Sequence, residues 1–358
     1  MLVFWVLPLF ALVYVAWHMW TILPLAAIWK TLVIVVGVSC FLILFLSVAR
    51  KFDSLPLPLA QLSYEIGTSS IIVLLYLVIL FLVLDLGRLV HLVPQSLLYH
   101  NWYASAGIFV LLFGIFLYGN FHYYNKVRVP LVLKSSKPLP KAYKVVMASD
   151  LHLGYHNPRK ELARWVDMIN AEHPDFILIA GDIIDGSMRP LLEERMAEEF
   201  HRLQAPVYAC LGNHEFYAGQ PEAKQFYRDA GIHLLIDDCA VIDGSIVIIG
   251  RDDRTNMRRK PVKDLIDKKE LYSIVLDHQP YNLDRTEAAG VDFQLSGHTH
   301  RGQVWPISWI TDHIYECSWG SHRRGNTQYY ISSGIGIWGG KFRIGTRSEY
   351  AVININNK

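Results

Sequence analysis

The sequence predicts an α/β domain of mainly parallel strands that follows four membrane-spanning helices. Two observations predict this organisation. Only seven charged side chains occur before Asn125, so 30 of the 34 lysines and arginines lie in the rest of the chain. Beyond residue 140, short apolar segments alternate with helical patterns, as in a layered α/β domain. We therefore expect a transmembrane region over residues 1–125 and an α/β domain over residues 126–358.

Four apolar segments in the first part predict transmembrane helices. Each is close to the roughly 20 residues that a helix needs to cross a hydrocarbon core of about 30 Å. The segments cover residues 2–22, 27–48, 70–92 and 102–119. A cleaved signal peptide is a poor alternative for the first segment, which lacks a basic start and precedes further apolar segments. The sequence thus predicts an integral membrane protein.

The distribution of basic residues predicts the orientation. Arg50 and Lys51 follow the second apolar segment, and only Lys30 lies on the opposite side. Six basic residues and no acidic residue follow the fourth segment: Lys126, Arg128, Lys134, Lys137, Lys141 and Lys144. With four spans, both basic groups share one face, so the positive-inside rule predicts an inner-membrane protein with both termini and the α/β domain in the cytoplasm. We also expect the second basic group to attract an anionic leaflet.

Asp85 and Arg88 are charged residues inside the third apolar segment. A buried charge in a membrane is costly unless it is paired. Their spacing of three residues favours a pair with each other on one helix face over a contact with substrate or with another helix.

Composition argues against two classes of protein. The four cysteines form no CxxC pair, which favours reduced thiols over a disulfide framework. The net charge of +2, with basic and acidic residues mixed, does not indicate nucleic-acid binding.

Five short apolar segments in the second part predict buried strands. They cover residues 145–148, 176–180, 207–211, 273–276 and 291–295. Between the first two, Leu162, Trp165, Val166 and Ile169 recur at helical spacing after Pro158, which suits a helix start. A second helix is expected over residues 191–203.

Polar residues follow each of these five strands. Asp-x-His, Gly-Asp, Gly-Asn-His-Glu, a single His and Gly-His-x-His occur in that order, and they contain Asp150, His152, Asp182, Asn213, His214, His278, His298 and His300. Any one of them could be ordinary turn chemistry. Because ligands bind outside the carboxyl ends of strands in open α/β sheets, the joint pattern predicts one shared metal site. Mixed carboxylate, amide and imidazole ligands suit Mn²⁺, Fe²⁺ or Zn²⁺ better than Ca²⁺.

This ordered set resembles the calcineurin-like metallophosphoesterase superfamily, from about Lys144 to the C-terminus. The tail segments 330–339 and 343–347 resemble its transmembrane branch, which includes bacterial enzymes similar to UDP-2,3-diacylglucosamine pyrophosphatases. The resemblance implies a four-layer α/β/β/α sandwich with two divalent metal ions. It implies that one metal is bound by Asp150, His152 and His300 and that the other is bound by Asn213, His278 and His298. Asp182 would bridge the two ions.

The resemblance also implies that His214 acts in catalysis without binding metal, by protonating the leaving oxygen or holding the phosphate. Arg301 stands where the family pattern has Gly, which puts the substrate pocket in doubt. Asp185 either orients a ligand or caps the following segment. For Tyr217, Arg301 and Arg343, a substrate contact and a solvent-facing role both stay open.

The expected function is a membrane-anchored two-metal phosphoesterase that hydrolyses a phosphodiester or pyrophosphate. Its partners would be the lipid bilayer and a phosphorylated substrate, such as UDP-2,3-diacylglucosamine or a related lipid-linked molecule, and not nucleic acid. One alternative is a general phosphodiesterase or phosphatase that is merely localised to the membrane. Another is a non-catalytic membrane scaffold. Substrate-binding residues and oligomeric state are not predicted.

Overall fold

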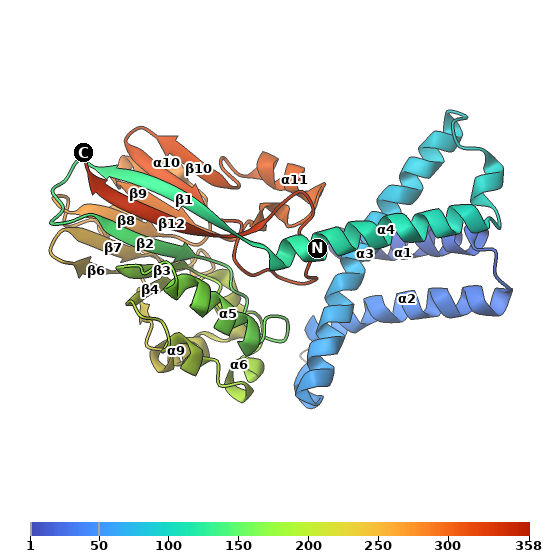
Figure 1. Cartoon of the computed structure of the whole chain (residues 1–358), viewed down its shortest axis with the longest axis horizontal. Helices are drawn as coiled ribbons and strands as arrows, with labels where there is room; N and C mark the ends of the chain where they lie inside the picture. The colour runs from blue at the N-terminus through green and yellow to red at the C-terminus, as the bar shows by residue number, and fades with distance from the viewer. Residues whose placement is uncertain (1, 49–50) are drawn as a thin grey trace. The chain divides into compact units, whose positions relative to one another are not determined.

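The computed structural model describes residues 2–48 and 51–358, and the chain divides into two compact units (Figure 1). The helical unit comprises Met1–Asn120 and Gly339–Lys341. The α/β unit comprises Phe121–Trp338 and Phe342–Lys358.

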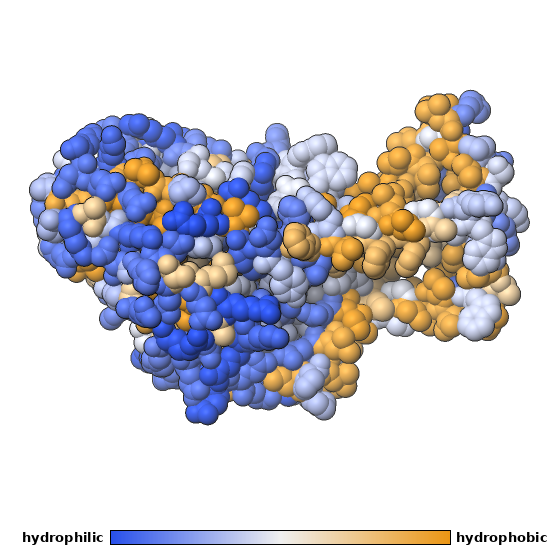
Figure 2. Space-filling model, in the orientation of Figure 1, coloured by the Kyte–Doolittle hydropathy of each residue, from blue (hydrophilic) through white to orange (hydrophobic). Residues whose placement is uncertain are grey.

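The helical unit contains four apolar helices. They are α1 (Leu2–Ile22), α2 (Ala27–Val48), α3 (Leu57–Leu89) and α4 (Trp102–Tyr124), with short 3-10 turns η1 (Lys51–Ser54) and η2 (Gln95–Leu98). Many large apolar side chains of these helices are exposed, and Figure 2 shows the resulting hydrophobic surface. Such a surface suits lipid rather than water.

The number of spans differs from the prediction. Among the described residues, three segments are long and apolar enough to cross a membrane: Ala27–Leu46, Leu57–Leu89 and Trp102–Tyr124. The assessed part of the first helix, Leu7–Ile22, is shorter. The third helix also begins 13 residues before the predicted residue 70, because Pro56 and Pro58 favour a helix start and the polar residues after them do not interrupt it.

The predicted pairing of Asp85 with Arg88 is wrong. Tyr14 OH donates to Asp85 Oδ2 at 2.7 Å, and His18 Nε2 lies 3.0 Å from the same oxygen. The His18 ring also stacks on Phe81. Because α1 packs on α3, the carboxylate reaches another helix instead of its own helix neighbour.

The α/β unit contains two six-stranded sheets. The first has the order β1 (Lys126–Ser135), β12 (Ser348–Asn357), β2 (Tyr143–Ala148), β3 (Phe176–Ala180), β4 (Val207–Cys210) and β5 (His233–Leu234). The second has the order β10 (Gly320–Arg324), β11 (Thr327–Ile331), β9 (Phe293–Ser296), β8 (Tyr272–Leu276), β7 (Ile246–Gly250) and β6 (Asp238–Ile242). Strands β2, β3 and β4 are parallel, as are β7, β8 and β9. The carboxyl ends of each set therefore meet at one edge of their sheet.

Successive side chains of a strand point to opposite faces of its sheet and so contribute to two different cores. In β2, Val145 and Met147 join the core between the two sheets, whereas Val146 and Ala148 face the helices. The helices that cover the first sheet are α5 (Arg159–Asn170), α6 (Arg189–Glu193), α7 (Ala197–Phe200) and α9 (Gln220–Asp229). The 3-10 turn η3 (Val262–Asp264) and α10 (Leu283–Ala288) pack on the second sheet, and α8 (Asn213–Ala218), η4 (His300–Gly302) and α11 (Ile307–Ile314) complete the unit. Because both faces of each sheet are covered, the central strands are continuous apolar segments, and the predicted four-layer sandwich is confirmed.

One predicted helix needs correction, and one strand was not predicted. The helix expected over residues 191–203 is divided into α6 and α7, because Arg195 adopts a left-handed backbone conformation with φ of 53°. The strand that was not predicted is β1, at the start of the segment that carries the second basic group. It pairs in parallel with β12, and Leu133 of β1 is buried in the core between the sheets.

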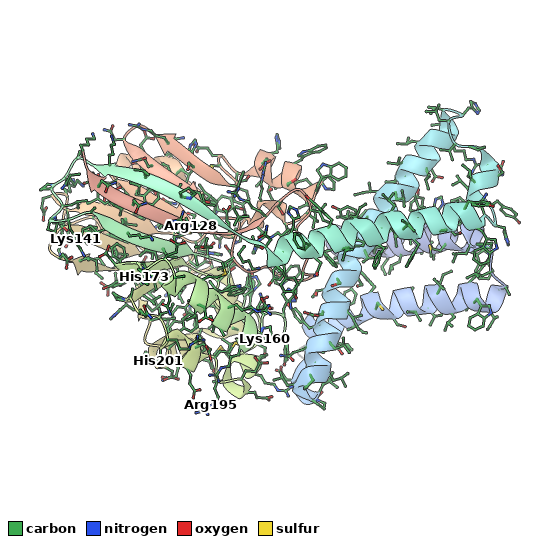
Figure 3. All side chains as sticks on the ribbon, viewed as in Figure 1. Arg128, Lys141, Lys160, His173, Arg195 and His201 are labelled. Carbon is green, nitrogen blue, oxygen red and sulfur yellow. The ribbon has the colours of Figure 1, made fainter. Side chains whose placement is uncertain are left out.

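Four of the six residues of the second basic group form ion pairs within the α/β unit. Arg128 and Lys144 contact Glu172, and Lys141 contacts Asp175. Lys137 forms an ion pair with Asp292 at 2.6 Å. Figure 3 labels Arg128 and Lys141 on the α/β unit. Because these ion pairs neutralise four basic side chains, the expected electrostatic attraction of this segment to an anionic leaflet is weaker.

Candidate metal centre

The strand ends bring the predicted metal-binding side chains into two compact groups. Asp150, His152 and His300 offer ligand atoms that all lie within 4.8 Å of one another. Asp182, His278 and His298 form a second group by the same measure. These residues follow β2, β3, β8 and β9, so the two sheets contribute jointly to both groups.

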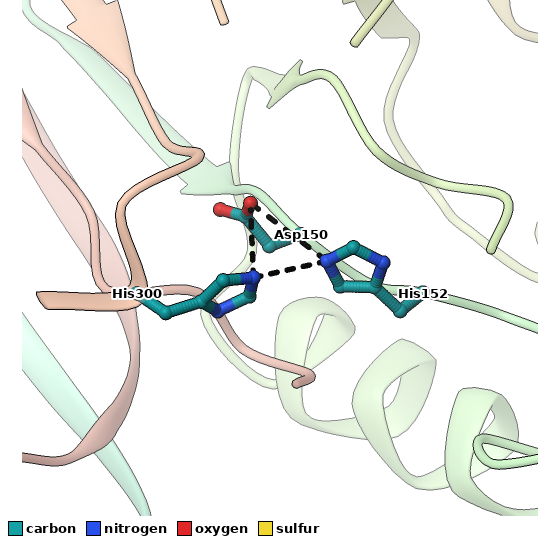
Figure 4. A group of neighbouring side chains, drawn as sticks. All are labelled: Asp150, His152 and His300. Atoms are coloured by element: carbon teal, nitrogen blue, oxygen red, sulfur yellow. Dashed lines mark hydrogen bonds and ion pairs between the residues drawn. The ribbon is translucent and has the colours of Figure 1, made fainter. Parts of the chain in front are cut away.

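The first group is shown in Figure 4. His152 Nε2 and His300 Nε2 lie 3.0 Å apart. Asp150 Oδ1 lies 3.6 Å from His300 Nε2 and 4.0 Å from His152 Nε2. One oxygen and two imidazole nitrogens therefore converge on one small volume.

The second group contains an imidazole whose tautomer can be assigned from its surroundings. His278 Nδ1 lies 2.8 Å from the Ala180 carbonyl oxygen, which can only accept, so Nδ1 donates. His278 Nε2 then faces Asp182 Oδ2 at 3.1 Å. Metal-binding histidines commonly have this arrangement, with one nitrogen bonded to a carbonyl and the other directed at the metal.

Asp182 lies between the two groups. Its Oδ2 atom is 3.1 Å from His278 Nε2 and 3.8 Å from His152 Nε2. This position is consistent with the bridging role that the family resemblance implies.

Five of the seven predicted ligands have left-handed backbone conformations. The φ angles are 54° at Asp150, 45° at His152, 52° at Asp182, 73° at His298 and 46° at His300. Non-glycine residues adopt this region at a cost of about 1–3 kcal/mol each, and such residues cluster at functional sites. The strained backbone of these loops thus orients the five side chains towards a common point.

Two glycines permit the close approach of the strand ends. A Cβ atom on Gly212 would lie 2.1 Å from Asp182 Oδ1, and one on Gly297 would lie 2.3 Å from Asp150 Oδ2. Any side chain at either position would displace a predicted ligand.

Asp185 orients two histidines. Its Oδ1 atom lies 3.0 Å from His214 Nδ1 and 3.5 Å from His152 Nδ1. Of the two interpretations that the sequence left open, the geometry favours the orienting role. The backbone N–H of His214 also donates to Asp182 Oδ1 at 3.0 Å.

Two buried charged residues that support the centre were not predicted. Glu215 accepts from the backbone N–H groups of Gly212 at 2.7 Å and Ile184 at 3.0 Å, which ties the loops after β3 and β4 together. Its place three residues after Gly212 is a typical capping position, so the Gly-Asn-His-Glu motif contained a signal for it. Arg343 carried no comparable signal.

Arg343 is fully buried and is not a solvent-facing residue. It donates to the backbone carbonyls of His300 at 2.9 Å and Gly336 at 3.0 Å. Arg301 instead lies over the Trp319 ring, 4.6 Å from its centroid. Tyr217 is 55% exposed, with its ring edge-on to His214.

The electrostatics of the cluster depend strongly on burial. Burial, partly offset by His278, raises the pKa of Asp150. Burial and then the charge of His278 lower the pKa of His298 to about 4. Burial alone would lower the pKa of His214, but the charges of Asp182 and Asp185 raise it to about 9. A dication would shift the ligands towards carboxylates and neutral imidazoles, the forms that bind metal.

The donor set fits divalent cations. Asn213 Oδ1 is buried and has no hydrogen-bond partner among the described residues. The His152–His300 contact places two imidazole nitrogens 3.0 Å apart, and the Asp182 carboxylate lies 3.1 Å from His278 Nε2. A divalent cation would be bound by the nitrogen and oxygen atoms at these contacts. The mixture of oxygen and nitrogen donors suits Mn²⁺, Fe²⁺ or Zn²⁺.

Comparison with known proteins gives a consistent picture. The model of the calcineurin-like phosphoesterase family matches residues 143–302, a range that contains all eight predicted site residues. An uncharacterized metallophosphoesterase of Aquifex aeolicus is 32% identical over 248 residues, which cover 65% of this chain and 93% of that protein. An uncharacterized metallophosphoesterase of Campylobacter jejuni is 30% identical over 248 residues. The alignment covers 65% of this chain and 65% of that protein, which is just under two thirds of its length.

A further relative combines the domain with a membrane region. The transmembrane protein with metallophosphoesterase domain of Danio rerio is 28% identical over 251 residues, which cover 63% of this chain and 57% of that protein. Together with the apolar helices, this relative indicates a membrane protein. Since the alignment with the Aquifex protein spans nearly all of that relative and the matched region holds the clustered ligand motifs, the chain belongs to the calcineurin-like phosphoesterase family.

Proposed function

We propose that this protein is a membrane-anchored two-metal phosphoesterase that hydrolyses a phosphodiester or a pyrophosphate. The observation that carries the proposal is the convergence of two ligand groups from the strand ends of both sheets, with Asp182 between them. We assign Asp150, His152 and His300 to one ion, Asn213, His278 and His298 to the other, and Asp182 to both.

The charges of this ligand set favour an anionic substrate. Asp150 and Asp182 provide two negative charges against two dications, while Asn213 and neutral imidazoles provide none. Bound divalent ions would stabilise charge on phosphoryl oxygens and supply hydroxide at neutral pH.

His214 is positioned to manage a proton. Its Nδ1 atom is held by Asp185, so the Nε2 atom is left for the substrate. In the protonated form, Nε2–H can donate to a leaving oxygen or to a phosphate oxygen. The carboxylate of Asp185 stabilises that form and fixes the orientation of the ring.

The membrane helices support an amphiphilic substrate. A phosphoesterase that acts on water-soluble molecules does not require an apolar anchor, whereas a substrate held in the bilayer is met more often by an anchored enzyme. Our specific candidate is UDP-2,3-diacylglucosamine, cleaved to a lipid monophosphate and UMP. Comparison of acylated with deacylated UDP-glucosamine tests this candidate. Equal turnover of both would refute the lipid assignment and leave the metal chemistry standing.

Metal content and activity together test the reaction class. Purified protein should hydrolyse bis(4-nitrophenyl) phosphate with Mn²⁺, lose that activity on chelation and recover it when Mn²⁺ is restored. Asp182→Ala should lose at least one equivalent of bound metal and at least 1000-fold in turnover, because the shared ligand is removed. The matched control Asp284→Ala changes an exposed carboxylate on α10 and should behave as the wild type. Full activity in a metal-free sample would exclude the proposal.

A further inference from the structure

A basic pocket lies in the α/β unit between the loop that follows β7 and helix α10. Its volume is about 720 Å³, within the range of about 300–1,000 Å³ that is typical of ligand sites. Five cationic side chains line it, and none of the described lining residues is acidic. The five are Arg251, Arg254, Arg259, Lys263 and Arg285.

The positive charge of this pocket is only partly neutralised nearby. Arg251 and Arg259 share the buried carboxylate of Asp277, at 2.5 Å and 2.9 Å. Among the described residues, Arg254, Lys263 and Arg285 form no ion pair. The five lining cations and the shared Asp277 carboxylate carry a net charge of +4, which the carboxylates of Asp252 and Asp253 on the same loop reduce to about +2 around the pocket. A concave surface with this charge concentrates anions.

The loop that carries these cations is held in place by its own acidic residues. Asp252 and Asp253 are buried at 5% and 1% exposure. Asp253 accepts from Gln279 Nε2 at 2.8 Å and from the backbone N–H of Thr255 at 2.8 Å. Arg259 Nη1 donates to the Asp252 carbonyl at 3.0 Å. The carboxylates of the loop therefore fix its shape, and they do not line the pocket.

The pocket is connected to the metal centre through intervening residues. Asp277, which pairs with two of the pocket arginines, immediately precedes the predicted ligand His278. A second connection runs through aromatic rings. The His298 ring lies 6.4 Å from that of Tyr315, the Tyr315 and Tyr281 rings are 4.8 Å apart, and the Arg254 guanidinium lies 3.9 Å from the Tyr281 ring centroid.

We propose that this pocket is a subsite that binds a second anionic group of the substrate while the first lies at the metal centre. The inference rests on the proposed phosphoesterase function and narrows it to substrates with at least two anionic groups, such as a pyrophosphate diester. The pocket cations would bind the phosphate that is not attacked or an anionic part of the leaving group. A phosphodiester with a single charge would make no use of them.

Binding of inorganic pyrophosphate to the full-length, metal-free protein tests the subsite without requiring activity. Isothermal titration calorimetry in low salt should show binding by the wild type. The triple variant Arg254→Gln/Lys263→Gln/Arg285→Gln should weaken it at least 30-fold, since it removes the three cations without an ion-pair partner and leaves the buried Asp277 cluster intact. Arg258→Gln, an exposed arginine of the same loop outside the pocket, is the matched control and should bind as the wild type. Unchanged pyrophosphate binding by the triple variant would refute the subsite.

Steady-state kinetics with Mn²⁺ tests whether the bound group belongs to the substrate. For UDP-N-acetylglucosamine, a pyrophosphate diester, the triple variant should raise KM at least tenfold with kcat within twofold. For bis(4-nitrophenyl) phosphate, both constants should stay within twofold of the wild type. Equal KM changes for both substrates, or none, would overturn the assignment to the substrate. If the wild type hydrolysed neither compound, the proposed function would fail, while the calorimetry would still decide whether the pocket binds anions.

Discussion

Arg343 donates to two backbone segments around the candidate metal centre, one at His300 and one at Ser333–Gly336. Besides the carbonyls of His300 and Gly336, it donates to the Ser333 carbonyl at 2.5 Å. Burial lowers the pKa of Arg343 to about 10, so the guanidinium stays charged at neutral pH. A planar group with five donors can satisfy several carbonyls at once, whereas a lysine ammonium has a different geometry.

The Arg343 network predicts a large loss of stability on substitution. Arg343→Leu leaves buried carbonyls without donors, each at a cost of about 1–3 kcal/mol, so we expect a fall of several degrees in Tm. Arg343→Lys should fall between this variant and the wild type. Thermal unfolding in detergent measures the effect, and Arg323→Lys, on the exposed strand β10, is the control. A Tm for Arg343→Leu equal to that of the control would show that the network is not stabilising.

Asp185 is not one of the predicted metal ligands. It supports the site by orienting the imidazoles of His152 and His214. Loss of such an orienting partner typically costs about 10–100-fold in metal affinity or activity. Asp185→Asn keeps the size of the side chain and removes its charge, so we expect a fall of that size in Mn²⁺-dependent turnover. The metals should be retained at saturating concentration, which inductively coupled plasma mass spectrometry can measure. Turnover within twofold of the wild type would contradict the orienting role.

At the scale of elements, all five predicted strands are present, but seven further strands were not predicted, and these include β7 and β12, which are buried and lie inside their sheets. Strands β2, β3 and β8 are continuous apolar segments, and their predicted ranges agree with the structure within two residues. Strand β1 alternates basic and apolar residues only over Lys126–Val129 and then contains Pro130, a pattern that an edge strand tolerates but that does not identify one. Its pairing with β12 joins residues more than 200 positions apart, which no local pattern reveals.

At the candidate site, some features depend on local sequence and others depend on the packed fold. The ligand motifs are local, because each follows its own strand, and the order of the strands was enough to propose a shared centre. The support of the centre is not local. Asp185 reaches His152 and His214 from another loop, and Arg343 meets His300 across 43 residues. The orientation of a long polar side chain depends on the packed structure, so these roles required the fold.

The contact between β1 and the end of α5 predicts a pH dependence. The hydrogen bond from Arg128, against an opposing effect of burial and with help from Lys144, lowers the pKa of Glu172 from 4.5 to about 2. The stabilisation from ionised Glu172 is therefore complete above pH 4.5 and is lost as the pH falls towards 2. Because Arg128 is largely exposed, the pair is worth about 0.2–1 kcal/mol.

Arg128→Ala should return the pKa of Glu172 towards its ordinary value. Its destabilisation should be greatest above pH 5, should decrease as the pH falls towards 2, and should disappear only below pH 2, where Glu172 is protonated in both proteins. Denaturant unfolding between pH 7 and pH 3 measures the difference. Lys134→Ala, also on β1 but without an ion pair among the described residues, should show no such trend. A destabilisation that is constant with pH would exclude the ion pair as its cause.

At the scale of the whole molecule, the orientation of the apolar helices would determine which pool of substrate the proposed phosphoesterase reaches. Basic residues flank the apolar region at Lys51 and again after α4, from Lys126 onwards. Several of the latter are paired within the folded α/β unit. The positive-inside bias counts basic residues within about 15–20 positions of a helix end during insertion, before such pairs exist, so the pairing does not cancel it.

We therefore predict that the α/β unit faces the cytoplasm. A protease added to sealed, right-side-out cells should leave the region after Lys126 intact, as detected by an antibody against the C-terminus. The same protease should digest it after the cells are permeabilised, which shows that the region is cleavable. Digestion in sealed cells would place the unit outside. A substrate made and consumed in the cytoplasmic leaflet would then be excluded, and the two-metal chemistry would have to act on a molecule presented at the outer face.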